Sequence, residues 1–327
     1  LDRRSIGEAE KILGQMGEDR LLREAGNLPY PGSLSMTFMM WIRDHEPETY
    51  RKTRAFGHTN TFLVHRLTGE WAMDHSNAAY TGLYFTNEYG RWNYALAEEL
   101  GIDSGKLPPL VFSSDVAGNL TSGAAGMLGL PAGIPVVPGG GDSGVAAVGA
   151  GVEEEGQILT CSGTVEVMVM STATPVPSPN YLIATHPLRD KWLIMNIVPT
   201  GGCALEWVRR EMYRDMDKDE FYSRQLPLVL GSDAENDSGN DASTGVEAVP
   251  WFAGDRTSFH QLSASFSGIS LGATRDDILR ATAEGIVAEM RRRYDYYLEH
   301  WKPDLTIRYT GGGGELDCDD AAPDVSP

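Results

Sequence analysis

Cysteine is scarce in the 327-residue sequence, and the few cysteines lie far apart. Cys161, Cys203 and Cys318 form no C-x-x-C pair, and no histidines surround them at the spacing of zinc ligands. The sequence therefore gives no sign of a disulfide framework or of a structural zinc site. Free, well-separated thiols are typical of a reducing compartment, so we expect a cytoplasmic protein.

Basic residues are also few compared with acidic residues. Lys and Arg total 27 against 46 Asp and Glu, which gives a formal net charge of -19. Such a surface repels a phosphate backbone and argues against nucleic acid as a partner. No apolar run approaches the ~18 residues of a membrane-spanning helix, so no membrane insertion is expected. The length is typical of two domains or one large domain.

Apolar residues recur at helical spacing in several parts of the chain, and the sequence predicts helices over 4–22, 36–53 and 276–301. Within the second segment, Pro47 is expected to start a new turn. A further helix of small residues is predicted over 143–151. The region 229–245 is rich in Asp, Ser, Gly and Asn and is typical of an exposed insertion loop.

Strand signals lie close to glycines. The stretch GIPVVPG (133–139) is interpreted as a buried strand, because β-branched residues are bounded by Gly and Pro. Residues 156–170 contain two β-rich runs joined by Ser-Gly-Thr, the pattern of a hairpin. A strand over 305–310 runs directly into four glycines. A helix, a strand and a glycine turn in this order are typical of a nucleotide-binding crossover.

Three glycine turns stand out, at 139–141, 162–164 and 311–314. Glycine lets a backbone approach a phosphate closely, and successive N–H groups in such turns bind anions. Two interpretations are open: the three turns together build one phosphate-binding cleft, or they are unrelated tight turns. Glycines 139, 141 and 144 also fit G-x-G-x-x-G, which leaves an NAD-dependent oxidoreductase as a distant alternative.

Asp142 follows the first turn in the stretch VVPGGGDSGVAAVG (136–149). A carboxylate there would repel a bound pyrophosphate. Beside a hydroxyl that attacks a phosphorus atom its charge is useful, because it accepts the hydroxyl proton. The alternative interpretation is structural, with Asp142 as the N-cap of the helix predicted over 143–151.

Six blocks of the sequence resemble the FGGY carbohydrate kinase family, in the family's order, and the xylulokinases in particular. They are LDRRSIGEAE (1–10), LTGEWAMDHSNAAYTGLY (67–84), PVVPGGGDSGVAAVGAG (135–151), CSGTVEV (161–167), VPWFAGDRT (249–257) and YTGGGG (309–314).

The resemblance implies an α/β, actin-like fold of two ribonuclease-H-like domains with a cleft between them. The remainder of a sugar-binding domain would span 1–151, the first part of an ATP-binding domain 152–314, and an atypical acidic tail 315–327. The implied reaction is the ATP-dependent phosphorylation of a sugar or polyol hydroxyl, with a ketopentose favoured and Mg²⁺ on the nucleotide. Dimers are common in the family, so a homodimer is a further expectation.

The resemblance also assigns site residues. Asp142 matches the base that takes a proton from the attacking sugar hydroxyl, and Ser143 stands beside it at the sugar. Gly163 and Thr164 match the hairpin that holds phosphate. The adenosine motif is matched by Gly311, Gly312 and Gly313.

Both ends of the chain depart from the family pattern. The N-terminal G-x-D-x-G-T hairpin and the sugar-contacting segment after it are missing, and the chain closes on ELDCDDAAPDVSP instead of a further domain. Phe38 stands where the family typically carries Lys, and Ser143 where xylulokinases usually carry Asn. We therefore expect a fold that is incomplete in both domains. The second hypothesis is a catalytically inactive, truncated kinase or a sugar-binding remnant.

Overall fold

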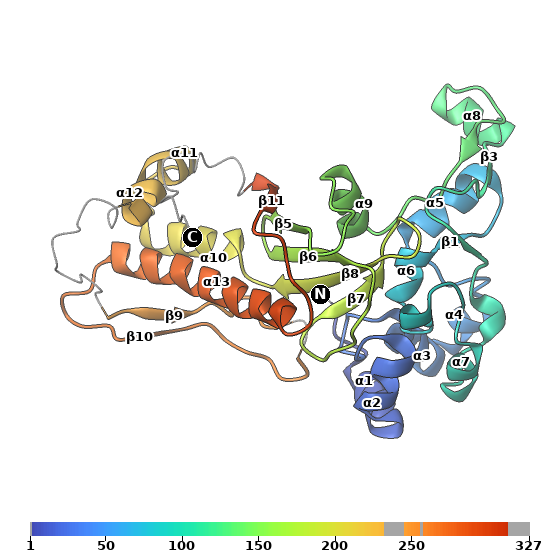
Figure 1. Cartoon of the computed structure of the whole chain (residues 1–327), viewed down its shortest axis with the longest axis horizontal. Coiled ribbons are helices and arrows are strands. Elements are labelled where there is room, and N and C mark those ends of the chain that lie inside the picture. The colour runs from blue at the N-terminus through green and yellow to red at the C-terminus, as the bar shows by residue number, and fades with distance from the viewer. Residues whose placement is uncertain (1, 232–244, 256–257, 313–327) are drawn as a thin grey trace.

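The computed structural model describes residues 2–231, 245–255 and 258–312. A five-stranded sheet lies in the middle of the molecule, with the helices of the first 128 residues on one side (Figure 1). A second group of helices and a small two-stranded sheet lie on the other side. None of the helices in these residues combines the length and the apolar character that a membrane span requires.

The first region is mostly helical. Its helices are α1 (Ile6–Met16), α2 (Glu18–Ala25), α3 (Ser35–His45), α4 (Pro47–Lys52), α5 (Thr59–Thr68), α6 (His75–Ala79), α7 (Tyr94–Glu99) and α8 (Ser122–Leu128), with 3-10 turns η1 (Thr86–Glu88) and η2 (Ser104–Lys106). Two short strand pairs accompany them, β1 (Met73–Asp74) with β2 (Leu110–Val111) and β3 (Gly118–Asn119) with β4 (Pro135–Val136).

Two predictions for this region can be compared directly with the structure. Pro47 begins α4, as expected, because its fixed φ suits the first helical position. The single helix predicted over 4–22 is wrong. Gly17 has a φ of 72°, which L-residues rarely adopt, and it separates α1 from α2.

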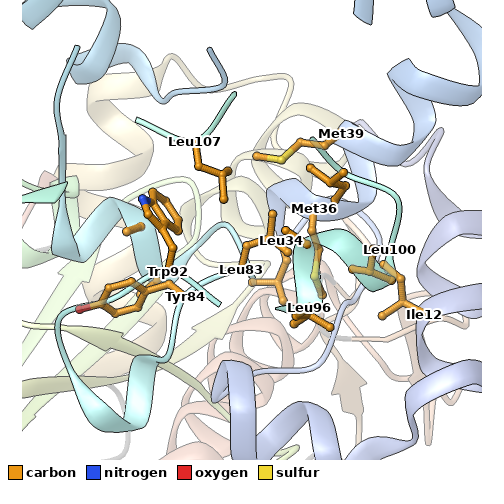
Figure 2. Close-up of a cluster of buried hydrophobic side chains, with 14 of the residues drawn as sticks. Ile12, Leu34, Met36, Met39, Leu83, Tyr84, Trp92, Leu96, Leu100 and Leu107 are labelled. Carbon is orange, nitrogen blue, oxygen red and sulfur yellow. The ribbon is translucent and has the colours of Figure 1, made fainter. Parts of the chain in front are cut away.

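The core of this region is a continuous cluster of buried aliphatic, Met and aromatic side chains (Figure 2). Ile12 of α1, Met36 of α3 and Leu96 of α7 meet there, and all three are at most 1% exposed. Ala184 of the central sheet belongs to the same cluster. The first region and the central sheet therefore share one hydrophobic core.

The central sheet has the strand order β11-β5-β6-β8-β7. Its strands are β5 (Ile158–Ser162), β6 (Glu166–Thr172), β7 (Leu182–Thr185), β8 (Trp192–Val198) and β11 (Ile307–Thr310). The predicted hairpin over 156–170 is confirmed, because β5 and β6 pair antiparallel. β11 pairs with β5 in parallel, and α13 is the last helix before it in the chain.

Helices cover both faces of this sheet. Alternate residues of β5 and β6 point to opposite faces, so Ile158 packs with Tyr297 of α13 (Arg275–Leu298). Leu159, the next residue, packs with Ala147 of α9 (Asp142–Gly149). The helices predicted over 276–301 and 143–151 are thus α13 and α9, and they enclose the sheet between them.

The strand predicted over 133–139 is shorter and more exposed than expected. Only Pro135 and Val136 form β4, and Ile134 and Val137 are 38% and 48% exposed. The reason is the pairing: β4 pairs only with β3, a strand of two residues, and of these two β4 residues only Val136 packs against the small cluster of α8. The prediction of a buried strand is therefore wrong.

The second helical group contains α10 (Gly202–Met212), α11 (Lys218–Glu220), the π-helical turn η3 (Phe221–Gln225) and α12 (Leu226–Gly231). The small sheet pairs β9 (Glu247–Val249) with β10 (Ser265–Ser267). The start of the predicted insertion loop, 229–231, belongs to α12. Its remainder up to residue 244, and the tail at 315–327, lie outside the described residues.

Asn27 joins the first region to the edge of the central sheet. Its Nδ2 donates to the carbonyl of Ile183 at 2.8 Å, and its Oδ1 accepts from the Ile183 N–H at 2.8 Å. The side chain thus takes the place of a neighbouring strand beside β7, and it is only 1% exposed. Buried backbone groups need such partners, because an unsatisfied one destabilises the fold.

We expect Asn27→Ala to lower the free energy of unfolding by about 2 to 3 kcal/mol, because it leaves a buried N–H and a buried carbonyl without partners. Urea unfolding measures this change. Asn119→Ala is the control, since Asn119 is exposed on β3 and its loss should change stability by less than about 0.5 kcal/mol. Equal stabilities of the two variants would contradict the role of Asn27.

Candidate active site

Two of the three predicted glycine turns meet at one end of the central sheet. Thr310 of β11 pairs with Cys161 of β5, which places the turn after β11 beside the hairpin turn after β5. A Cβ added to Gly311 would lie 2.2 Å from the Ser162 carbonyl oxygen, and Gly311 has a φ of 96°. Only glycine fits there, because a side chain would clash with backbone.

The hairpin turn also contacts the start of α10. Gly163 O accepts from the Gly202 N–H at 2.8 Å, and Thr164 O accepts from the Cys203 N–H at 3.2 Å. The positive end of the α10 dipole therefore lies beside the exposed residues Gly163 and Thr164. A helix N-terminus next to a glycine turn is suited to binding phosphate.

Open space lies in front of both turns. A Cβ added to Gly163 or to Gly312 would meet no atom within 4 Å. Glycine at these two positions is therefore not required by packing within the protein. The third residue assigned to the adenosine motif, Gly313, lies outside the described residues.

Asp142 is the first residue of α9 and is exposed. Its Oδ1 accepts from the Ser143 N–H at 2.7 Å and from the Ser143 hydroxyl at 3.3 Å. Gly141 occupies the N-cap position, and α9 has no side-chain cap. The interpretation of Asp142 as the N-cap is therefore wrong, although its charge in the first turn still favours the helix.

The negative charge of Asp142 affects the pKa of two neighbouring side chains, one on the central sheet and one at the end of α6. Burial raises the pKa of the Cys161 thiol on β5, and the charges of Asp142 and Glu166 raise it further. Burial likewise raises the pKa of the Tyr80 hydroxyl, and here the charge of Asp142 adds to the effect. Asp142 thus acts electrostatically on Cys161, which precedes the hairpin turn, and on Tyr80, which follows α6.

Each glycine of the G-x-G-x-x-G pattern has a local structural role: Gly139 has a φ of 69°, which favours glycine, and Gly141 and Gly144 allow close packing. A Cβ on Gly141 would lie 3.2 Å from Cε2 of Tyr80, and one on Gly144 would lie 2.9 Å from Cδ of Pro187. These glycines let the loop and α9 approach neighbouring side chains closely. The G-x-G-x-x-G spacing thus has a structural explanation that involves no dinucleotide.

Glu166 is a site residue that the sequence analysis did not identify. It is 6% exposed at the start of β6, where Oε1 accepts from the Ser162 hydroxyl at 2.8 Å and Oε2 has no hydrogen-bond partner. Burial raises the pKa of its carboxyl to about 7, against the lowering effect of the Ser162 hydrogen bond. The one sequence signal for a buried carboxyl at this position is that Glu166 is an acidic residue within an apolar strand pattern.

A second missed feature is the set of polar residues behind the 138–141 loop. Asp74, Ser76 and Asn77 lie in the block 67–84 and are at most 8% exposed. Ser76 Oγ accepts from the Gly141 N–H at 2.9 Å. Polar residues in a short turn give no sequence signal of a partner 65 positions away.

The acidic residues of the described ranges do not gather into a metal-binding cluster. No group of three or more His, Cys, Asp or Glu side chains in the described part of the chain is arranged to hold a metal ion. Mg²⁺ bound to a nucleotide needs only one or two carboxylates, because phosphate and water supply its other ligands.

Two domain families match consecutive parts of the chain. The N-terminal domain of the FGGY family of carbohydrate kinases matches residues 1–149, and the C-terminal domain of that family matches residues 158–317. The chain belongs to the FGGY family. Asp142 lies in the first FGGY match, and the hairpin turn and Gly311 lie in the second.

Individual FGGY kinases resemble the chain over most of its length. A xylulose kinase from Staphylococcus epidermidis is 31% identical over 252 residues, which cover 76% of this chain and 48% of that protein. A xylulose kinase from Bacillus subtilis is 26% identical over 320 residues, covering 97% of this chain and 61% of that protein. The chain thus spans about half to three-fifths of the length of these relatives.

A solved structure confirms the fold. The crystal structure of xylulose kinase from Rhodospirillum rubrum superimposes with a TM-score of 0.84 at 23% identity, covering 96% of this chain and 62% of that one. The expectation of an α/β, actin-like FGGY fold is therefore confirmed. The division at residues 151 and 152, and the roles of individual site residues, stay predictions.

The raised pKa of Glu166 makes the stability of this FGGY chain depend on pH. The folded-state pKa of about 7 lies above the ordinary value of 4.5, so the stability that Glu166 contributes is fully present below pH 4.5 and is lost as the pH rises through about 7. We expect Glu166→Gln to melt a few degrees above the unsubstituted chain at about pH 8, and this gap to close towards about pH 5.

Thermal unfolding across this pH range measures the effect. Glu10→Gln, at an exposed position of α1, is the control and should follow the unsubstituted chain at every pH. A Glu166→Gln variant with the same melting temperature as the unsubstituted chain at high pH would show that the carboxyl ionises without cost.

Proposed function

We propose that this chain performs the ATP-dependent phosphorylation of a sugar or polyol hydroxyl, with a ketopentose as the favoured substrate. The observation that carries the proposal is the position of Asp142, an exposed carboxylate at the start of α9 whose charge acts on Cys161 at the end of β5, just before the glycine hairpin, in a member of the FGGY kinase family. The names of two relatives, both xylulose kinases, support the choice of a ketopentose.

Asp142 is the general base in this proposal. Among the described residues it forms no ion pair with Lys or Arg, so its carboxylate is free to accept a proton. It would take the proton of the sugar hydroxyl while the hydroxyl oxygen attacks the γ-phosphorus of ATP. Ser143, hydrogen-bonded to Asp142, would contact the sugar.

The nucleotide would lie along the two turns at the end of the sheet. The turn at Gly163 and Thr164 would hold the phosphates, and the positive end of the α10 dipole beside it would favour their negative charge. Gly311 and Gly312 would border the adenosine, since an added Cβ at Gly312 meets only open space. Mg²⁺ on the nucleotide would offset the charge that develops on the transferred phosphoryl group.

Other parts of the proposal rest on the resemblance alone. They are the division into a sugar-binding part (1–151) and an ATP-binding part (152–314), a homodimer, and a cytoplasmic setting, which suits the free thiols of Cys161 and Cys203. The competing hypothesis is a chain that binds sugar without phosphorylating it.

A coupled assay of ADP release tests the proposal, with D-xylulose, L-ribulose, L-fuculose, glycerol and gluconate as acceptors. We expect turnover with a ketopentose and a loss of about 10²- to 10⁴-fold in Asp142→Asn, which cannot accept the proton. Asp219→Asn is the matched control, because Asp219 is also exposed in the first turn of a helix. A folded chain that binds a sugar but releases no ADP would support the sugar-binding alternative.

The role of the hairpin is tested separately by Gly163→Ala. The added methyl group meets no protein atom, so the melting temperature should not change. It projects from the turn that would hold phosphate and keeps the phosphate from approaching the backbone closely, so the KM for ATP should rise about tenfold. Gly126→Ala, equally unobstructed on α8, should leave the KM unchanged. An unchanged KM in Gly163→Ala would remove the hairpin from the ATP site.

A further inference from the structure

A buried carboxylate lies behind the loop that leads to Asp142. Asp74 is 0% exposed and forms the N-cap of α6. Its Oδ1 accepts from the Ser76 hydroxyl and, at 3.0 Å, from the Asn77 N–H. Its Oδ2 accepts from Nδ2 of Asn60 at 2.6 Å and from Nδ2 of Asn77 at 2.7 Å.

All four donors to Asp74 are neutral groups, and none of the Lys and Arg side chains in the described ranges pairs with it. A buried charge is tolerated only where such hydrogen bonds satisfy it. A neutral residue could cap a five-residue helix such as α6 equally well. The carboxylate therefore does more than cap: it orients two side chains that reach the loop.

These two side chains, Ser76 and Asn60, hold both ends of the 138–141 loop. The Ser76 hydroxyl donates its proton to Asp74, so its lone pairs are turned to the Gly141 N–H, which donates to Oγ at 2.9 Å. Asn60 Nδ2 donates to Asp74 and also to the Pro138 carbonyl at 3.2 Å. Asp142 follows Gly141 directly.

The loop has little freedom to move relative to this network. A Cβ on Gly140 would lie 3.0 Å from Ser76 Oγ, so the backbone rests directly on that hydroxyl. Behind it, His58 Nδ1 lies 2.7 Å from Asn77 Oδ1, and Ser35 Oγ lies 3.0 Å from His58 Nε2. The exposed Asp142 is thus attached to an extended and largely buried hydrogen-bond network.

We propose that Asp74 and Ser76 are positioning residues for Asp142. Asp74 orients the Ser76 hydroxyl, Ser76 fixes the Gly141 N–H, and the backbone direction at Gly141 sets where the Asp142 carboxylate meets the sugar hydroxyl. The role in turnover rests on the proposed kinase function. The attachment of the loop to Ser76 does not depend on it.

Ser76→Ala tests the proposal in the full 327-residue chain. Small displacements of a catalytic group are costly, so we expect kcat to fall about tenfold to a hundredfold, with the KM for ATP within about twofold. The matched control is Ser171→Ala. Ser171 is also buried, and its hydroxyl donates to the Glu153 carbonyl at 3.0 Å, far along β6 from the hairpin turn.

A double variant separates positioning from general destabilisation. If Ser76 acts through Asp142, Ser76→Ala should cause no further loss of turnover in an Asp142→Asn background. An equal loss in both backgrounds would overturn the proposal. Asn60→Ala, which releases the Pro138 carbonyl at a half-buried position, is the second variant, and the same dependence on Asp142 is expected of it.

Hydrogen exchange supplies a measurement that needs no turnover. The Gly141 amide should exchange at least about tenfold faster in Ser76→Ala than in the unsubstituted chain, and Ser171→Ala should leave it unchanged. Unchanged exchange in Ser76→Ala overturns the proposal even in an active enzyme. If the unsubstituted chain shows no turnover, the kinase function fails for this chain, and the exchange of Gly141 alone decides whether Ser76 holds the loop.

Discussion

Backbone hydrogen bonds from Gly202 to Gly163 and from Cys203 to Thr164 hold the turn between β5 and β6 against the start of α10, and the rest of the site is arranged around this contact. On one side of the turn, Gly311 lies so close to Ser162 that no side chain fits between them. Residues 39 positions apart (163 and 202) and 149 positions apart (162 and 311) are therefore brought together by backbone atoms. Such an arrangement is rigid, because it depends on no flexible side chain.

The sheet that carries this turn is enclosed by helices on both faces. α13 covers the face of Ile158, and α9 covers the face of Leu159. Tyr297 of α13 adds hydrogen bonds from its hydroxyl to the Met168 and Ile194 carbonyls, at 2.9 and 3.1 Å. Because α9 begins with Asp142, packing of its apolar face on the sheet also decides where that carboxylate lies.

Two carboxyl groups near the site occupy very different surroundings. Asp142 is exposed, and within the described ranges its side chain accepts hydrogen bonds from Ser143 alone. Glu166 is buried with one oxygen unsatisfied, which disfavours its ionised form. A buried, poorly satisfied carboxyl reduces stability, and proteins keep such groups mainly near functional sites. The fold therefore gives up stability close to the turn that the proposed mechanism uses.

Much of this protein was determined by the sequence alone. Period-two and period-3.6 patterns predicted the β5–β6 hairpin, α9, α13 and β11, because these elements depend on local spacing of apolar residues and on turn glycines. The ordered motifs identified the FGGY family and singled out Asp142.

What only the tertiary structure decided depends on contacts between distant residues: the bond between Ser76 and Gly141, the burial that raises the pKa of Glu166, and the exposure of β4. Local sequence patterns carry no information about such partners, since a hydroxyl or a carboxyl looks the same in the sequence whether the fold buries it or not.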